Sequence, residues 1–202
     1  REVSLTLQGS VQFLKGDMKS AYEILSLAKQ INPSNSNVLI KLALIELERN
    51  NYLQMHEHLE KAYEADPKNP ALFYHRGEIF ALSGNLQEAI NDFDTAIKLY
   101  PNFILAYVHK ARAFLGIERY SDAEELLREA MNRFDSKVEI WNSLGEVMVM
   151  KKDFESAENI FNSILLKYPK TPEVYLNMAL LSMTRNNDSS SAEKHLRKAI
   201  EI

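Results

Sequence analysis

Histidines come closest to forming a chemical site in this sequence, because its 202 residues include five histidines and no cysteine. The absence of thiols excludes a disulfide framework, a thiolate zinc site and a cysteine nucleophile. His56 and His58 lie two positions apart, which on a helix turns their side chains about 200° away from each other. We therefore expect both to lie on a solvated face and not to share a metal ion.

His75 and His109 form a second candidate pair, because they occupy equivalent positions in neighbouring units of a repeat described below. Both are expected to face the same groove, but a metal site would need a third ligand, and the sequence nominates none. The sequence also lacks a glycine-rich phosphate loop, a Gly-x-Ser-x-Gly elbow and a His-Glu-x-x-His motif. We predict no catalytic residue, no metal site and no cofactor, and hence that the chain is not an enzyme.

Charge and composition narrow the possible partners. The chain has 24 Lys and Arg residues against 28 Asp and Glu residues, and this near balance argues against nucleic-acid binding. No apolar run approaches the roughly 18 residues needed to cross a bilayer, so we expect the chain itself to be soluble. The sequence starts at Arg1, from which we expect a piece of a longer protein.

Prolines recur with a period of 34 residues, which indicates an internal repeat. Intervals of 34, 34 and 68 residues separate Pro33, Pro67, Pro101 and Pro169. Asp135 occupies the vacant proline position between the last two. In this register we predict a single solenoid over residues 2–202, with repeats 2–35, 36–69, 70–103, 104–137, 138–171 and 172–202.

Positions that were not used to set this register also recur with the same period. The eighth position of each repeat is small: Gly9, Ala43, Gly77, Ala111, Gly145 and Ala179. The twenty-fourth is large and apolar, with one extra residue allowed in the last repeat: Leu25, Leu59, Phe93, Leu127, Phe161 and Leu196. Small residues let two helix backbones approach closely, and large residues fill the space beside them. Each repeat is therefore predicted to be a pair of antiparallel helices.

The turn between the two helices of a repeat is expected where glycine or asparagine recurs, at Gly16, Asn50, Gly84 and Asn186. This whole pattern is typical of the tetratricopeptide repeat. We predict an all-α, right-handed superhelical solenoid of six helix-turn-helix repeats, in which the first helix of each repeat lines a concave face.

The later repeats place apolar and acidic side chains together on that concave face. The candidate peptide-binding groove comprises Leu105, Val108, Arg112, Leu115, Glu139, Asn142, Glu146, Val149, Met150, Glu173, Leu176, Asn177, Leu180 and Met183. Exposed apolar surface flanked by carboxylates suits a basic amphipathic helix, and methionines adapt to varied side chains. The alternative is that some of these residues contact a neighbouring helix and the acids are merely solvated.

A second use of such a concave face is to hold the C-terminal carboxylate of a chaperone tail. That requires Lys and Asn at the fifth and ninth positions of one repeat, because an anionic terminus needs cations and amide donors. Here these two positions hold Thr6 and Ser10, Ile40 and Leu44, Tyr74 and Glu78, Val108 and Arg112, Asn142 and Glu146, and Leu176 and Leu180. We therefore do not expect this chain to dock a chaperone tail.

Several runs resemble a particular tetratricopeptide family. They are Gly9 followed by Phe13-Leu14-Lys15, Asp66-Pro67 leading into Tyr74-His75-Arg76-Gly77, Glu88-Ala89 with Asp92-Phe93, Lys167-Tyr168-Pro169 before Pro172-Glu173-Val174, and Lys198-Ala199-Ile200-Glu201-Ile202. The chain resembles, nearly end to end, the C-terminal half of the large tetratricopeptide receptor of the mitochondrial outer-membrane translocase. Tyr74-His75-Arg76-Gly77 is the most distinctive run, whereas Asp135 departs from the pattern where a proline is expected.

The resemblance implies a receptor on the cytosolic face of the mitochondrial outer membrane. Its partners would be precursor polypeptides with amphipathic or hydrophobic targeting segments and other translocase subunits. In that family an N-terminal transmembrane helix and a chaperone-binding repeat cluster precede the precursor pocket, so chaperones would bind only parts that this chain lacks. Two other readings stay open, namely a scaffold of some other multiprotein complex and a regulatory module of an enzyme.

Overall fold

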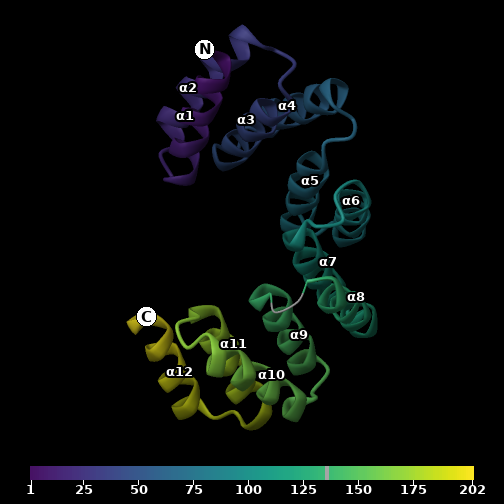
Figure 1. Cartoon of the computed structure of the whole chain (residues 1–202), viewed down its shortest axis with the longest axis vertical. Helices are drawn as coiled ribbons and strands as arrows, with labels where there is room; N and C mark the ends of the chain where they lie inside the picture. The colour runs from purple at the N-terminus through teal and green to yellow at the C-terminus, as the bar shows by residue number, and fades with distance from the viewer. Residues whose placement is uncertain (135–136) are drawn as a thin grey trace. The chain divides into compact units, whose positions relative to one another are not determined.

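The computed structural model describes residues 1–134 and 137–202, and Asp135, which breaks the proline pattern, lies outside them. The described residues form twelve α-helices and no strand (Figure 1). In chain order the helices are α1 Glu2–Leu14, α2 Met18–Ile31, α3 Ser36–Glu48, α4 Tyr52–Ala65, α5 Pro70–Leu82, α6 Leu86–Leu99, α7 Ile104–Gly116, α8 Tyr120–Arg133, α9 Val138–Met150, α10 Phe154–Lys167, α11 Pro172–Asn186 and α12 Ser189–Glu201. The odd-numbered helices start 34 residues apart.

The chain divides into two compact units, which are described separately. The N-terminal unit comprises residues 1–83 and 91–101, and the C-terminal unit comprises residues 84–90 and 102–202. In the N-terminal unit α1 packs on α2, α3 packs on α4, and α5 packs on both α3 and α4. In the C-terminal unit α7 packs on α8, α9 on α10 and α11 on α12, with α9 also against α7, α8 and α11.

Close approach of two helices explains the small residue at the eighth position. A Cβ atom added to Gly9 would lie 2.6 Å from Leu25, and one added to Gly145 would lie 2.3 Å from Phe161. Gly77 is in the same situation, with Phe93 at 2.8 Å. These distances are shorter than any van der Waals contact, so a larger residue would force the helices apart.

The turns between paired helices use left-handed backbone conformations. Gly16, Asn50 and Gly84 have φ values of 78°, 58° and 80°, as expected from their residue types. Glu118 and Lys152 adopt the same conformation in the later repeats, with φ values of 58° and 64°. A side chain with a Cβ is strained there, so the period of the repeat and not local preference sets these turns.

The prediction of a turn at Asn186 is wrong by one residue. Asn186 is the last residue of α11, and Asn187 adopts the left-handed conformation with a φ of 52°. The shift arises because α11 has 15 residues, whereas α7 and α9 have 13.

The prediction that His58 is solvated is also wrong. His56 is exposed, but His58 is only 4% exposed and its Nδ1 atom has no hydrogen-bond partner among the described residues. The buried residues of α4 are Met55, His58, Leu59 and Ala62, which follow the 3, 4 and 7 spacing of a helix face. His58 thus lies on the apolar side of α4, and this spacing was available from the sequence.

Within residues 1–134 and 137–202, none of the helices combines the length and apolar character that crossing a bilayer requires.

Candidate binding groove in the C-terminal unit

A cavity of about 740 Å³ lies in the C-terminal unit between α7, α9 and the connection from α10 to α11. Its lining comprises Leu105, Val108, His109, Arg112, Val138, Glu139, Asn142, Ser143, Lys167, Tyr168, Pro169, Lys170, Thr171 and Glu173. We refer to it as the groove cavity. Helix geometry places the α7 residues Leu105, Val108 and Arg112 on one side, since they are spaced by three and four positions.

The groove cavity contains six of the residues predicted from the sequence. They are Leu105, Val108, Arg112, Glu139, Asn142 and Glu173. His109, which was expected to face a groove, also lines it. Among the described residues, however, no three His, Asp or Glu side chains are grouped so that they could hold a metal ion.

Other predicted residues form an apolar stripe on α11. Leu176, Leu180 and Met183 are each 41–49% exposed and follow one face of the helix. Met150, at the end of α9, is exposed to a similar degree. Exposed apolar side chains grouped in this way are the kind of surface that binds other polypeptides.

The remaining predicted residues are engaged with other parts of the C-terminal unit. Glu146 forms an ion pair with Arg112, at 3.5 Å between the carboxylate and the guanidinium Nε. The Nδ2 atom of Asn177 donates a hydrogen bond of 3.0 Å to Oδ1 of Asn142. Leu115 is half-buried.

The assignment of Val149 to the groove surface is wrong, because its side chain is fully buried. The physical reason is the position of α9, which is packed against α7, α8, α10 and α11 at once. Little of α9 is left for a ligand, so only part of the helix face predicted from the repeat register reaches the groove. Val108 is also largely buried, although it contributes to the cavity wall.

The segment from Lys167 to Thr171 contributes five residues to the groove cavity, and none of them was predicted from the sequence. It joins α10 to α11 and was not considered because only first helices were expected to form the surface. A signal was present: Lys167 and Lys170 flank Tyr168-Pro169, which places two cations and an aromatic ring at a repeat junction.

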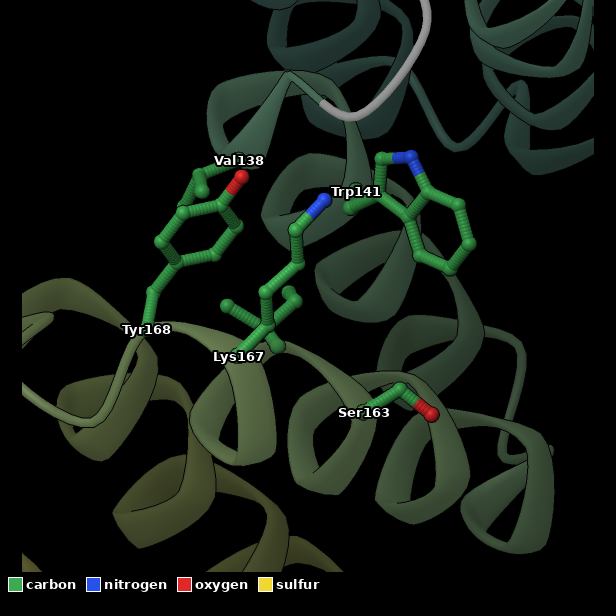
Figure 2. Close-up of a pocket in the computed structure, with 6 residues that line it drawn as sticks. Val138, Trp141, Ser163, Lys167 and Tyr168 are labelled. Atoms are coloured by element: carbon green, nitrogen blue, oxygen red, sulfur yellow. The ribbon is translucent and has the colours of Figure 1, made fainter.

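A smaller cavity of about 170 Å³ adjoins this segment. It is lined by Val138, Trp141, Ser163, Ile164, Lys167 and Tyr168, three of which also line the groove cavity. Figure 2 shows the Lys167 side chain extending between the rings of Tyr168 and Trp141. The Lys167 Nζ atom lies 5.2 Å from the centroid of the Tyr168 ring, a distance at which a cation and an aromatic face attract each other.

The charges of the groove cavity are mixed, and cations outnumber acids. Arg112, Lys167 and Lys170 line it together with only two carboxylates, Glu139 and Glu173. The carboxylate of Glu146, which was expected to attract a basic ligand, is paired with Arg112. The surface is therefore less acidic than its sequence positions indicated.

Comparison with known protein families identifies the kind of repeat. Two family models described as "Tetratricopeptide repeat" match residues 70–103 and 118–182. Together with the paired helices and their 34-residue period, these matches show that the chain contains tetratricopeptide repeats, and they confirm the all-α solenoid class.

The chain is 30% identical over 179 residues to the mitochondrial import receptor subunit TOM70 of Saccharomyces cerevisiae, covering 89% of this chain and 29% of that protein. The crystal structure of yeast Tom70 superposes with a TM-score of 0.78 at 27% identity, covering 99% of this chain and 42% of that chain. The resemblance to this receptor family is thereby confirmed.

A relative from a different assembly is also similar. The BBSome complex member BBS4 of Bos taurus is 24% identical over 208 residues, covering 100% of this chain and 38% of that protein. The chain spans about a third of the length of these curated relatives.

Proposed function

We propose that this chain is a polypeptide-binding module of a mitochondrial import receptor. In this role it binds precursor proteins through their amphipathic or hydrophobic targeting segments, at the cytosolic face of the outer membrane and next to other translocase subunits. The similarity to TOM70 over 89% of the chain supports the receptor class. The proposed role is binding and not catalysis.

The observation that carries the proposal is the exposed apolar surface of the C-terminal unit. Leu176, Leu180 and Met183 on α11 and Met150 on α9 present apolar side chains, and the groove cavity adds Leu105. Burying three or four such anchors contributes about 1.5–3 kcal/mol each, less the cost of ordering the ligand. The result is roughly micromolar affinity, which suits a client that must be released.

The experiment is a calorimetric titration of the chain with a synthetic mitochondrial presequence and with a segment of a hydrophobic inner-membrane carrier. We expect saturable binding that Leu176→Asp combined with Leu180→Asp weakens by about tenfold or more, because charges replace two anchors. Met150→Asp should weaken it less, since it removes one anchor. Glu146→Lys should weaken binding of the basic presequence, because it replaces a carboxylate beside the groove cavity with a cation.

The matched control is Leu53→Asp, a leucine on α4 of the N-terminal unit that is 78% exposed. If Leu53→Asp weakens binding as much as the α11 double variant, the binding surface is not where we place it. Circular dichroism of every variant must retain the wild-type helical signal, which separates lost binding from lost fold.

A second function is favoured by one observation, the 24% identity with BBSome complex member BBS4 over the whole chain. In this alternative the chain is a scaffold of another multiprotein complex. A single stoichiometric partner in a pull-down, with no affinity for either targeting segment, would favour the scaffold.

A further inference from the structure

Two largely buried polar residues line the groove cavity, and each has a donor that no described residue accepts. Asn142 is 7% exposed and Ser143 is 3% exposed, and both line the cavity. Asn142 accepts through Oδ1 from Asn177, but within the described part of the chain its Nδ2 atom donates to no acceptor. The Ser143 hydroxyl makes no hydrogen bond among the same residues. Among the described residues only Nδ1 of His58 is a fully buried side-chain atom without a partner, so both of these donors reach the open cavity. A ligand that supplies an acceptor there can exchange for solvent and form these hydrogen bonds.

Cations surround these donors. Lys167 and Lys170 line the same cavity, and neither forms an ion pair with another described residue. Arg112 is paired with Glu146 at 3.5 Å, which is long for a charge-assisted bond. Against these three cations the cavity has two acids, Glu139 and Glu173, both exposed.

The two acids lie in the first turns of α9 and α11. A carboxylate at that position is stabilised by the positive end of its own helix. The helix N-termini therefore stabilise Glu139 and Glu173 whether or not a ligand is bound. Lys167 and Lys170 are exposed as well and have no carboxylate partner among the described residues, whereas Arg112 is paired with Glu146.

We propose that the groove cavity binds a side-chain carboxylate, an Asp or Glu of the bound polypeptide, next to an apolar side chain that contacts Leu105 and the α11 stripe. The proposal rests on the proposed function and adds a sequence preference to it. Asn142 and Ser143 donate to the carboxylate, and Lys167, Lys170 and Arg112 supply the charge. The preferred segment is thus apolar with an acidic residue beside its anchor, and not uniformly basic.

The test uses a short amphipathic peptide with leucines on one face and a single Glu beside them, compared with the same peptide carrying Gln. Both peptides have amidated C-termini, so the Glu side chain is their only carboxylate. We expect the Glu peptide to bind the wild-type chain about tenfold more tightly than the Gln peptide, as measured by fluorescence anisotropy. The advantage should shrink with added salt, because exposed lysines contribute part of it.

Asn142→Asp is the most informative variant, because it is isosteric and still accepts the hydrogen bond from Asn177. It removes the donor that no described residue accepts and adds a negative charge, so we expect it to abolish the preference for the Glu peptide over the Gln peptide. Asn159→Asp is the matched control, since it makes the same change at an exposed position of α10 outside the cavity. It should leave the preference intact.

Four results would overturn the proposal, and they separate it from the function on which it rests. Equal affinity for the Glu and Gln peptides, still lowered by Leu176→Asp with Leu180→Asp, refutes the carboxylate preference and leaves polypeptide binding standing. A Glu preference that survives Asn142→Asp refutes the site. If a free C-terminus on the Gln peptide restores the full affinity, a terminal and not a side-chain carboxylate is bound. Failure of both peptides to bind at about 1 mM refutes both proposals.

Discussion

In the N-terminal unit most buried polar side chains form hydrogen bonds within the unit. In the C-terminal unit two buried polar residues, Asn142 and Ser143, line a cavity and have hydrogen-bond donors that no described residue accepts. Asp92 accepts two hydrogen bonds of 2.7 Å from Arg76, and Asn69 donates one of 3.0 Å to Ser36. Asn142 and Ser143, equally buried, have unused donors. The hydrogen bonds of the N-terminal unit stabilise its fold, whereas the donors of Asn142 and Ser143 stay open to the cavity, as the proposed carboxylate site requires.

The largest expected effect is a loss of stability, and it tests whether the bonded polar side chains of the N-terminal unit stabilise its fold. Asp92→Ala removes the partner of Arg76 at a site where the Asp92 side chain is 9% exposed. We expect it to lower the free energy of unfolding by about 3 kcal/mol, because an uncompensated, partly buried guanidinium remains. A urea titration followed by circular dichroism measures the change, and peptide binding to the C-terminal unit should survive in the folded fraction.

The control for Asp92→Ala is Asp122→Ala. Arg119 and Asp122 form the same kind of bidentate pair, with both hydrogen bonds at 2.9 Å, but both side chains are exposed. Exposed pairs contribute little, so we expect the urea midpoint to stay unchanged. Equal losses from the two variants would show that burial does not distinguish the pairs.

His58 is the exception in the N-terminal unit, and a pH series probes it. Burial lowers the pKa of His58 below its ordinary 6.5, with nearby Lys29 adding to the effect and Glu46 and Glu57 opposing it. Between the folded-state pKa and 6.5 the unfolded chain therefore binds more protons than the folded one. We expect stability to fall as the pH drops through this window, with a slope of at most about 1.4 kcal/mol per pH unit for one proton.

Urea titrations of His58→Leu across the same pH range should lack this component of the slope. His56→Gln removes an exposed imidazole two positions away and should keep it. If His56→Gln flattens the pH dependence and His58→Leu does not, the buried ring is not its source.

The smallest expected effects concern the left-handed turn positions. The N-terminal unit has Gly16 and Asn50 there, whereas the C-terminal unit has Glu118 and Lys152 in addition to Gly84 and Asn187. Lys152→Gly and Glu118→Gly should each raise the thermal midpoint and add up to about 1 kcal/mol, because glycine adopts positive φ without Cβ strain. Gly16→Ala should lower stability by a similar amount, and a gain from that variant would contradict the assignment.

Much of the fold could be predicted from the sequence, because particular positions of the repeat require a small or a large apolar residue each time. Gly9, Gly77 and Gly145 contact Leu25, Phe93 and Phe161 as the alternation of small and large residues predicted. The position of Asn187 did not follow, because the extra residue of the last repeat lengthens α11 rather than its turn.

The candidate site could be predicted from the sequence less completely than the fold. Periodicity identifies which side of a helix faces its partner, and it placed Leu105, Arg112 and Glu139 in the groove cavity. It does not tell how many neighbours pack on one helix, which is why Val149 was assigned to the surface although it is fully buried. Tyr168 and Lys170 were missed because they lie in a connection, where helical periodicity carries no information.

The most direct measurement is site-specific photo-crosslinking to a hydrophobic targeting segment, with a photoreactive amino acid replacing either Leu180 on α11 or Leu53 on α4. Leu53 is the more exposed of the two, at 78% against 41%, so exposure alone would favour it. We expect the segment to crosslink at position 180 and not at position 53. Crosslinking at position 53 without crosslinking at position 180 would contradict polypeptide binding by the C-terminal unit.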